Sequence, residues 1–266
     1  MRSRDELAIQ ELLAAHAQHP LYGVERLALH LRWSEKKTRR IRNLAGLVIP
    51  RPSKKRKTTR TVPAEITAPG NALKSYATFR DPNRPQDGQS YAGMVRSGAW
   101  VQDFTYLWLG RYYWYLAVVL DLATRQILGW QLGLSHSSEL TYAAVVDALS
   151  KHPTPDILHS DQGTEYLSYK HQELCDRLEI TLSCSDKASP WQNGFMERFM
   201  WTIQLELGPL NQYQDLPHFH EAIARAIYYY NHQRIHTALK MPPAAYAAKL
   251  RSSLDERELV SGKSRG

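Results

Sequence analysis

Residues 100–132 read WVQDFTYLWLGRYYWYLAVVLDLATRQILGWQL, and this stretch decides the fold. Polar and apolar residues alternate along WVQDFTYLW, and YYWYLAVVLD (112–121) is a long run of aromatic and β-branched residues. DLATRQ supplies a turn, and ILGWQL is a third apolar run. Runs of this kind joined by short turns are typical of an antiparallel meander. We therefore expect three consecutive strands at the start of a central sheet.

The pattern after this meander alternates helix and strand before it becomes helical. Helical spacing over 137–150 is followed by a short strand, DILHSD, a helix near 168–178 and another short strand, ITLSCS. From about Gly194 onward the spacing is helical. Three strands, then strand–helix alternation, then helices predict an α/β fold, with a mixed sheet covered by helices on both faces.

The bulk composition narrows the class of protein. A chain of 266 residues can bury one substantial core and carry a smaller module, and 43% hydrophobic residues are typical of a globular protein. No apolar run reaches the roughly 18 residues that cross a bilayer. The N-terminus does not read as a signal peptide, and two cysteines are too few for a disulfide framework or a Cys-rich zinc site. We expect a cytoplasmic protein without a membrane partner.

Positive charge is concentrated in the first quarter of the chain. Residues 1–60 hold 15 Lys/Arg and 5 Asp/Glu, a net charge of +10, whereas residues 61–266 hold 19 and 21, a net charge of −2. A short module this basic suggests a polyanionic partner, because each neutralised phosphate releases counterions. A merely solvated basic face is the alternative.

Helical spacing in the basic segment predicts a helix-turn-helix. Two helices are expected over 4–18 and 23–31, and Ser34 is placed to cap a third. A short helix pair whose second member is heavily basic fits a module that enters a DNA groove. The candidate DNA contacts on this third helix are Lys36, Lys37, Arg39, Arg40 and Arg42.

The segment between the two modules is expected to be a linker. RPSKKRKTTR (51–60) combines Pro with dense positive charge, and we interpret Lys54, Lys55, Arg56 and Lys57 as phosphate-tracking residues. Residues 61–99 are rich in Pro, Gly, Asn and Asp, with one short helix expected around 72–79. The expected domains are a helix-turn-helix module (1–50), a basic linker and connector (51–99), a core (100–210), and C-terminal helices with a tail (211–266).

Three carboxylates occupy unusual positions in this layout. Asp103 lies in the middle of the first strand, Asp161 ends the fourth, and Glu197 lies in the first turn of a helix. An ionised carboxylate in a core strand is costly unless it is paired, hydrogen-bonded or bound to a cation. Asp161 alone reads better as a turn residue, and Glu197 alone as an acid favoured by the helix dipole. Together the three acids indicate an oxygen-rich site for Mg²⁺ or Mn²⁺, of the kind that supports phosphoryl transfer.

The spacing of these three acids and the residues around them resemble those of a known family. Asp103 and Asp161 are separated by 57 residues, and Asp161 and Glu197 by 35. With WVQDFTYL, LHSDQGTEY and SPWQNGFMERF around the acids, the spacing resembles the DDE catalytic core of bacterial insertion-sequence transposases and retroviral integrases. YNHQRIHTALKMPPAAY (230–246) and YGVERLALHL resemble the C-terminal signature and the N-terminal helix-turn-helix of the same transposases. The resemblance covers about 20–60 and 100–246.

The resemblance implies a ribonuclease H-like fold in which Asp103, Asp161 and Glu197 are catalytic and bind two Mg²⁺ ions, for which Mn²⁺ would substitute. The implied reaction is cleavage at transposon ends by water, followed by attack of the 3′-hydroxyl on target DNA. Double-stranded DNA and a homo-multimer are the implied partners, and the bacterial nucleoid is the implied location. A retroviral-type integrase is disfavoured because the N-terminal module lacks a His/Cys zinc pattern. A catalytically silent DNA-binding scaffold or repressor is the alternative.

One position departs from the family pattern. Relatives commonly carry Lys or Arg seven residues after the catalytic Glu, where this chain has Gln204. Lys187 or Arg198 are candidates to replace that cation. The remaining candidate DNA contacts are Gln204 itself, Trp191 and Asn193, which precede the Glu197 helix, and Arg234 in the C-terminal signature.

Overall fold

The computed structural model describes residues 3–48, 68–79, 89–90, 98–187 and 189–263. By its internal contacts the chain divides into two compact units. One is formed by Thr58–Ile227, and the other combines Met1–Lys57 with Tyr228–Gly266. The predicted phosphate-tracking residues Lys54, Lys55, Arg56 and Lys57 lie outside the described residues.

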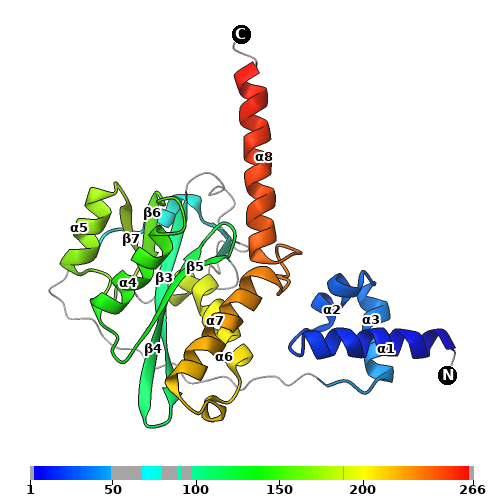
Figure 1. The fold of residues 1–266 in the computed structure, drawn as a ribbon. Coiled ribbons are helices and arrows are strands. Elements are labelled where there is room, and N and C mark those ends of the chain that lie inside the picture. The colour runs from blue at the N-terminus through cyan, green and yellow to red at the C-terminus, as the bar shows by residue number, and fades with distance from the viewer. Residues whose placement is uncertain (1–2, 49–67, 80–88, 91–97, 188, 264–266) are drawn as a thin grey trace. The chain divides into compact units, whose positions relative to one another are not determined.

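A five-stranded mixed sheet forms the centre of the larger unit (Figure 1). Its strands are β3 (Ala99–Leu109), β4 (Tyr112–Asp121), β5 (Ile127–Gly133), β6 (Ile157–Ser160) and β7 (Thr181–Cys184). The spatial order is β5-β4-β3-β6-β7, with antiparallel β5-β4-β3 pairing and parallel β3-β6-β7 pairing. The predicted meander and mixed sheet are therefore confirmed.

The sequence explains the position of the central strands. Five consecutive residues of β4, 116–120, are buried, which requires cover on both faces of the sheet. Gly110 has φ +62° in the turn from β3 to β4, a conformation that glycine adopts without strain. The long apolar run thus becomes an internal strand, and the tight turn returns it antiparallel to β3.

Helices cover the two faces of the sheet. The helices of the larger unit are α4 (Ser138–Leu149), α5 (Tyr169–Arg177), α6 (Gly194–Leu207) and most of α7 (Leu216–His232). Trp100, on β3, belongs to a buried cluster with Ala144 of α4 and Leu174 of α5. Side chains alternate along a strand, so Asp103 and Thr105 point to the opposite face, where α6 packs against β3. The face that carries Asp103 is therefore the one that α6 covers.

The connector docks on the edge of the sheet. Residues Ala72–Tyr76 form the 3₁₀ helix η1, and the backbone N–H of Ala72 donates to Ser183 Oγ of β7 at 2.9 Å. Strand β1 (Thr78–Phe79) then pairs antiparallel with β2 (Gln89–Ser90). The helix expected around 72–79 is therefore shorter than predicted, because its last residues are used in strand pairing.

The smaller unit contains the helical N-terminal module. Its helices are α1 (Ser3–Gln18), α2 (Val24–Leu31), α3 (Glu35–Leu44) and α8 (Pro243–Lys263). The predicted cap is present, since Ser34 Oγ accepts from the Lys37 N–H at 3.2 Å. The C-terminal segment belongs to the same unit: Ile235 N–H donates to Tyr22 Oη at 2.7 Å, and Arg26 Nε donates to the Ile235 carbonyl at 3.0 Å.

Candidate active site

The register of two neighbouring strands brings Asp103, within β3, beside the C-terminal end of β6, after which Asp161 follows. Strands β3 and β6 run parallel and pair Trp100 with Leu158 and Val101 with His159. The same offset relates Asp103 to Asp161, which follows directly after β6. Asp161 thus sits where β6 meets the following loop, whereas Asp103 lies within the continuous strand β3.

Protein donors hold the carboxylate of Asp103 in place. Its Oδ1 accepts from the Phe104 N–H at 2.8 Å and lies 3.5 Å from the Tyr166 hydroxyl. Its Oδ2 accepts from Asn193 Nδ2 at 3.3 Å. Asn193 is buried, and its amide oxygen has no hydrogen-bond partner among the described residues. Asn193 therefore connects Asp103 to the segment that leads into α6.

Glu197 and Asp161 act on Asp103 through their charge. Burial, followed by the charge of Asp161, raises the pKa of the Asp103 carboxyl well above its ordinary value. Glu197 and Glu165 raise this pKa further, and the Phe104 N–H opposes the shift. Every side chain that raises this pKa is a carboxylate, so a bound cation would relieve the repulsion. The charges of Asp161 and Glu197 thus both act on the Asp103 carboxyl.

Asp161 lies at the exposed rim of this site. Its Oδ1 accepts from the Gly163 N–H at 2.9 Å, and partial burial raises the pKa of its carboxyl. A Cβ at Gly163 would lie 2.7 Å from Glu165 Oε1 and 3.0 Å from Asp161 Oδ1, so the two acids crowd this glycine from both sides. A side chain at this position would therefore have to displace the carboxylate of Glu165.

Glu165 is a fourth acid, which the sequence interpretation did not select. Burial, followed by the charge of Asp161, raises the pKa of its carboxyl. The signal in the sequence was a second acid in the same loop, four residues after Asp161. Tyr166 was also missed: its fully buried hydroxyl reaches Asp103.

The donor set suits a hard divalent cation, because all of its acids offer oxygen ligands. Asp103 is half-buried, whereas Asp161 and Glu197 are exposed. Among the described residues, no three His, Cys, Asp or Glu side chains are gathered closely enough to hold a metal ion. The acids act on one another through their charges without forming a closed set of ligands.

The predicted DNA contacts near the acids occupy different environments. Lys187 and Arg198 are exposed, and the Arg198 guanidinium lies 5.3 Å from the centre of the Trp201 ring. Gln204 is turned toward the sheet, where its Nε2 donates to Thr105 Oγ1 at 2.8 Å. Trp191 belongs to the 3₁₀ turn η3 (Pro190–Asn193), and its side chain lies outside the described residues.

The predicted contacts in the smaller unit are partly engaged by the protein itself. Arg40 forms two hydrogen bonds with Asp5, at 2.8 and 3.0 Å, and Arg39 lies 3.7 Å from Glu35. The Lys37 ammonium lies 3.7 Å from the centre of the Trp33 ring. The remaining candidates are placed as follows: Lys36 is exposed, Arg42 Nε donates to the Leu47 carbonyl, and Arg234 is buried with 4% exposure.

Comparisons with known sequences find relatives of the core of this chain. Two family models described as integrase core domain match residues 96–190 and 178–243. The transposase for insertion sequence element IS904 of Lactococcus lactis subsp. lactis (strain IL1403) is 30% identical over 154 residues, 57% of this chain and 61% of the relative. InsK of insertion sequence element IS150 of Escherichia coli (strain K12) is 26% identical over 239 residues, 87% of this chain and 79% of the relative. The chain thus spans less than two thirds of the IS904 transposase.

A comparison with solved structures confirms the ribonuclease H-like fold. The HTLV-2 integrase catalytic core domain, solved in complex with magnesium, aligns with 58% of this chain and 98% of its own length. The TM-score is 0.50 and the sequence identity is 22%. In the part of the chain that the structure describes, no helix is both long and apolar enough to span a membrane.

Proposed function

Since this chain belongs to the integrase core domain family, we propose that it is a DNA transposase. Its reaction would be metal-dependent cleavage at transposon ends, followed by transfer of the 3′-hydroxyl end into target DNA. In this proposal Asp103, Asp161 and Glu197 are the catalytic acids. The 3′-hydroxyl is the nucleophile, so no covalent intermediate with the protein is needed.

One observation carries this proposal: the β3–β6 register that relates Asp103 to Asp161. Glu197 belongs to the same site, because its charge helps to raise the pKa of Asp103. Mutually repelling carboxylates are costly, and a structural role does not require three of them. Perturbed acids in one site favour a catalytic or metal-binding role.

We assign the metal to the same acids. Asp103, Asp161 and Glu197 would hold a pair of Mg²⁺ ions, replaceable by Mn²⁺, which when bound supply activation of a hydroxyl and stabilisation of the leaving oxygen. The side chains around these acids have a different task. Tyr166 and Asn193 donate hydrogen bonds to the two oxygens of Asp103 and so fix the orientation of its carboxylate.

We assign DNA binding to cations in both units. In the smaller unit, α3 would contact phosphates through Lys36, Lys37, Arg39, Arg40 and Arg42, with the linker residues Lys54, Lys55, Arg56 and Lys57 extending this surface. Near the acids, Lys187 and Arg198 are exposed and would take the place of the cation that Gln204 does not supply. A homo-multimer would join two ends in concert, acting on DNA in the bacterial cytoplasm.

A strand-transfer assay tests this function. The probes are labelled duplexes from the DNA that flanks the coding sequence, incubated with the full chain and a supercoiled target in Mg²⁺ or in EDTA. We expect joined products in the reactions with Mg²⁺ and none in those with EDTA. Specific binding of a probe without cleavage or joining in Mg²⁺ or Mn²⁺ would instead support the silent scaffold.

A further inference from the structure

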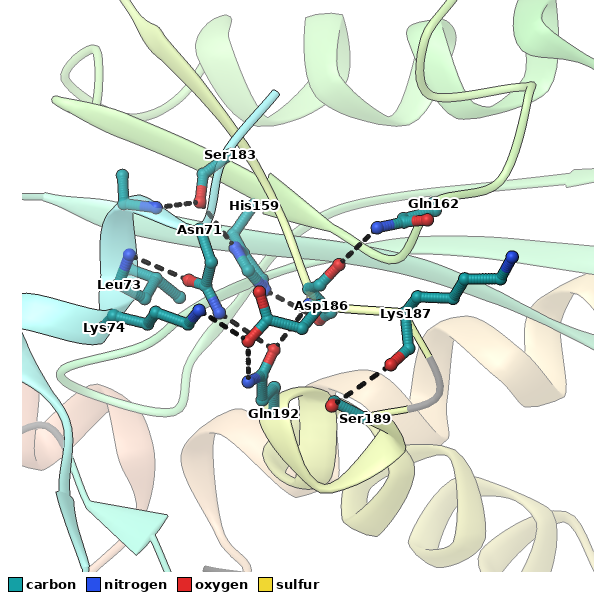
Figure 2. Close-up of polar contacts among 12 residues, drawn as sticks. Asn71, Leu73, Lys74, His159, Gln162, Ser183, Asp186, Lys187, Ser189 and Gln192 are labelled. Carbon is teal, nitrogen blue, oxygen red and sulfur yellow. Dashed lines mark hydrogen bonds and ion pairs between the residues drawn. The ribbon is translucent and has the colours of Figure 1, made fainter. Parts of the chain in front are cut away.

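The connector joins the segment that leads into the active-site helix through a polar network (Figure 2). Asn71 Nδ2 donates to Gln192 Oε1 at 2.8 Å, and Lys74 Nζ lies 2.9 Å from Asp186 Oδ2. Asn71 and Lys74 are more than 100 residues from these partners in the sequence. The connector therefore makes specific contacts with the core.

Gln192 is the centre of this network. Its Oε1 also accepts from the Asp186 N–H at 2.7 Å, and its Nε2 donates to Asp186 Oδ2 at 2.8 Å. The Gln192 amide, followed by Lys74, lowers the pKa of Asp186. Gln192 is buried with 9% exposure, so its amide would be costly to leave unpaired. Asn71 and Lys74 thus complete a set of bonds between Asp186 and Gln192.

The connector is itself fixed to the sheet. Ser183 Oγ, which accepts from the Ala72 N–H, also bonds His159 Nδ1 at 2.8 Å. His159 is fully buried, and its Nε2 lies 3.0 Å from Ser185 Oγ. Asn71 Oδ1 caps η1 by accepting from the Leu73 N–H at 3.0 Å. The strands that lead to the acids therefore also anchor Asn71 and Lys74.

The network ends at the catalytic acids. Asn193 follows Gln192 directly and donates to Asp103 Oδ2, and α6 begins at the next residue, Gly194. Glu197 lies in the first turn of that helix. A displacement of Gln192 would therefore reach both the hydrogen bond to Asp103 and the helical turn that carries Glu197.

We propose that Asn71 and Lys74 are positioning residues, which hold Asp186 and Gln192 so that Asn193 and Glu197 keep their places beside Asp103. The proposal rests on the transposase function proposed above. It assigns to the connector a role in catalysis without contact to DNA or metal. The Lys74–Asp186 ion pair is exposed and adds little to global stability, so the effect of losing it is expected in local order and turnover rather than in the free energy of unfolding.

Two variants separate this role from a general loss of structure. Asn71→Asp keeps the oxygen that caps η1 but replaces the donor to Gln192 with a repelling oxygen. Lys74→Gln removes the ion pair with Asp186, and Lys74→Arg restores it. Lys170→Gln is the matched control, because it removes an exposed ion pair with Glu139 elsewhere in the same unit.

The test combines amide hydrogen exchange with strand-transfer kinetics on the full chain. For Asn71→Asp and Lys74→Gln we expect several-fold faster exchange in peptides covering 189–200, with exchange in β4 unchanged. We also expect kcat for joining to fall about tenfold, because small misplacements of catalytic groups lower rates steeply, with KM for the DNA end nearly unchanged. Lys74→Arg and Lys170→Gln should behave as the wild type.

This test distinguishes failure of the positioning role from failure of the proposed transposase function. Unchanged exchange over 189–200 in both variants overturns the inference, whatever the activity. Faster exchange with unchanged kcat overturns the positioning role. A wild-type protein that never joins DNA overturns the transposase function and with it any role in joining, while the exchange rates still decide whether the connector orders this segment.

Discussion

Asp103, within β3, and Asp161, directly after β6, are related by the same offset that pairs Val101 with His159 in these two parallel strands. This relationship turns a separation of 57 residues in the sequence into proximity at the C-terminal end of β6. It also explains why Asp161 contributes more than any other charged side chain to the raised pKa of Asp103. The two acids repel each other in the absence of a cation.

Removing the charge of Asp103 is expected to abolish joining without destabilising the fold. The raised pKa means that ionisation of Asp103 at neutral pH costs stability in the folded state. Asp103→Asn keeps an oxygen that accepts from the Phe104 N–H. We expect its free energy of unfolding in EDTA to equal that of the wild type or to exceed it by about 1 kcal/mol. Urea unfolding followed by circular dichroism measures this, and a loss of stability beyond about 1 kcal/mol would contradict it.

Gln204 provides a test of the departure from the family pattern. Gln204→Lys exchanges the hydrogen bond to Thr105 for a cation, so the free energy of unfolding should fall by about 1 kcal/mol. If the new ammonium reaches a phosphate, end DNA should bind more tightly at low salt, and the salt dependence should steepen by about one unit. Fluorescence anisotropy at several salt concentrations measures the slope. Gln204→Met is the control for the lost bond, and an equal slope in both variants argues against a DNA contact at this position.

Helix α3 should supply phosphate contacts from its exposed cations. Replacing Lys36 and Arg39 with Gln is expected to weaken binding to all DNA sequences similarly and to reduce the salt slope by about one unit for each phosphate that is no longer neutralised. Arg40 differs, because Arg40→Gln also removes two hydrogen bonds to Asp5 and should lower stability. Lys151→Gln, which breaks a surface ion pair with Asp147, is the control. A slope unchanged in the Lys36 and Arg39 variants would place the DNA-binding surface elsewhere.

Tyr22 should couple the two ends of the chain within the smaller unit. Its buried hydroxyl accepts from the Ile235 N–H, so Tyr22→Phe leaves that backbone donor unpaired. We expect the free energy of unfolding to fall by about 1–3 kcal/mol. Hydrogen exchange should show faster exchange at residue 235 and in α2. Tyr228→Phe is the control, because Tyr228 is exposed. A Tyr22→Phe protein as stable as the control would show that this bond does not hold the unit together.

The strands and the helix cap were predictable because their signals are local or short in range. The 112–121 run forms β4 with the predicted bounds, since aromatic and β-branched residues suit a strand covered on both faces. Ser34 caps α3 as its sequence context predicted. Of the three acids, only Asp103 interrupts a local pattern that gives it no other role, and Asp161 and Glu197 were selected with it through their spacing and their resemblance to a known family.

The interactions that were missed depend on residues far away in the sequence. The role of Asn71 is set by Gln192, and that of Tyr166 by Asp103, and neither pair leaves a periodic signal. Gln204 was predicted to contact DNA in place of the usual cation, and its bond to Thr105 was not foreseen because it requires α6 to lie on β3. Arg234 was assigned to DNA, whereas packing of the C-terminal segment buries it.

The most direct test of the acid site is strand transfer by Asp161→Asn and Glu197→Gln, beside the wild type and Glu173→Gln, whose exposed acid lies on α5. Each substitution removes one charge and keeps the shape of the side chain. We predict that joining in Mg²⁺ falls by at least about a hundredfold in both site variants, with end binding retained and the control unaffected. Joining at the wild-type rate by either site variant would contradict the assignment of that acid.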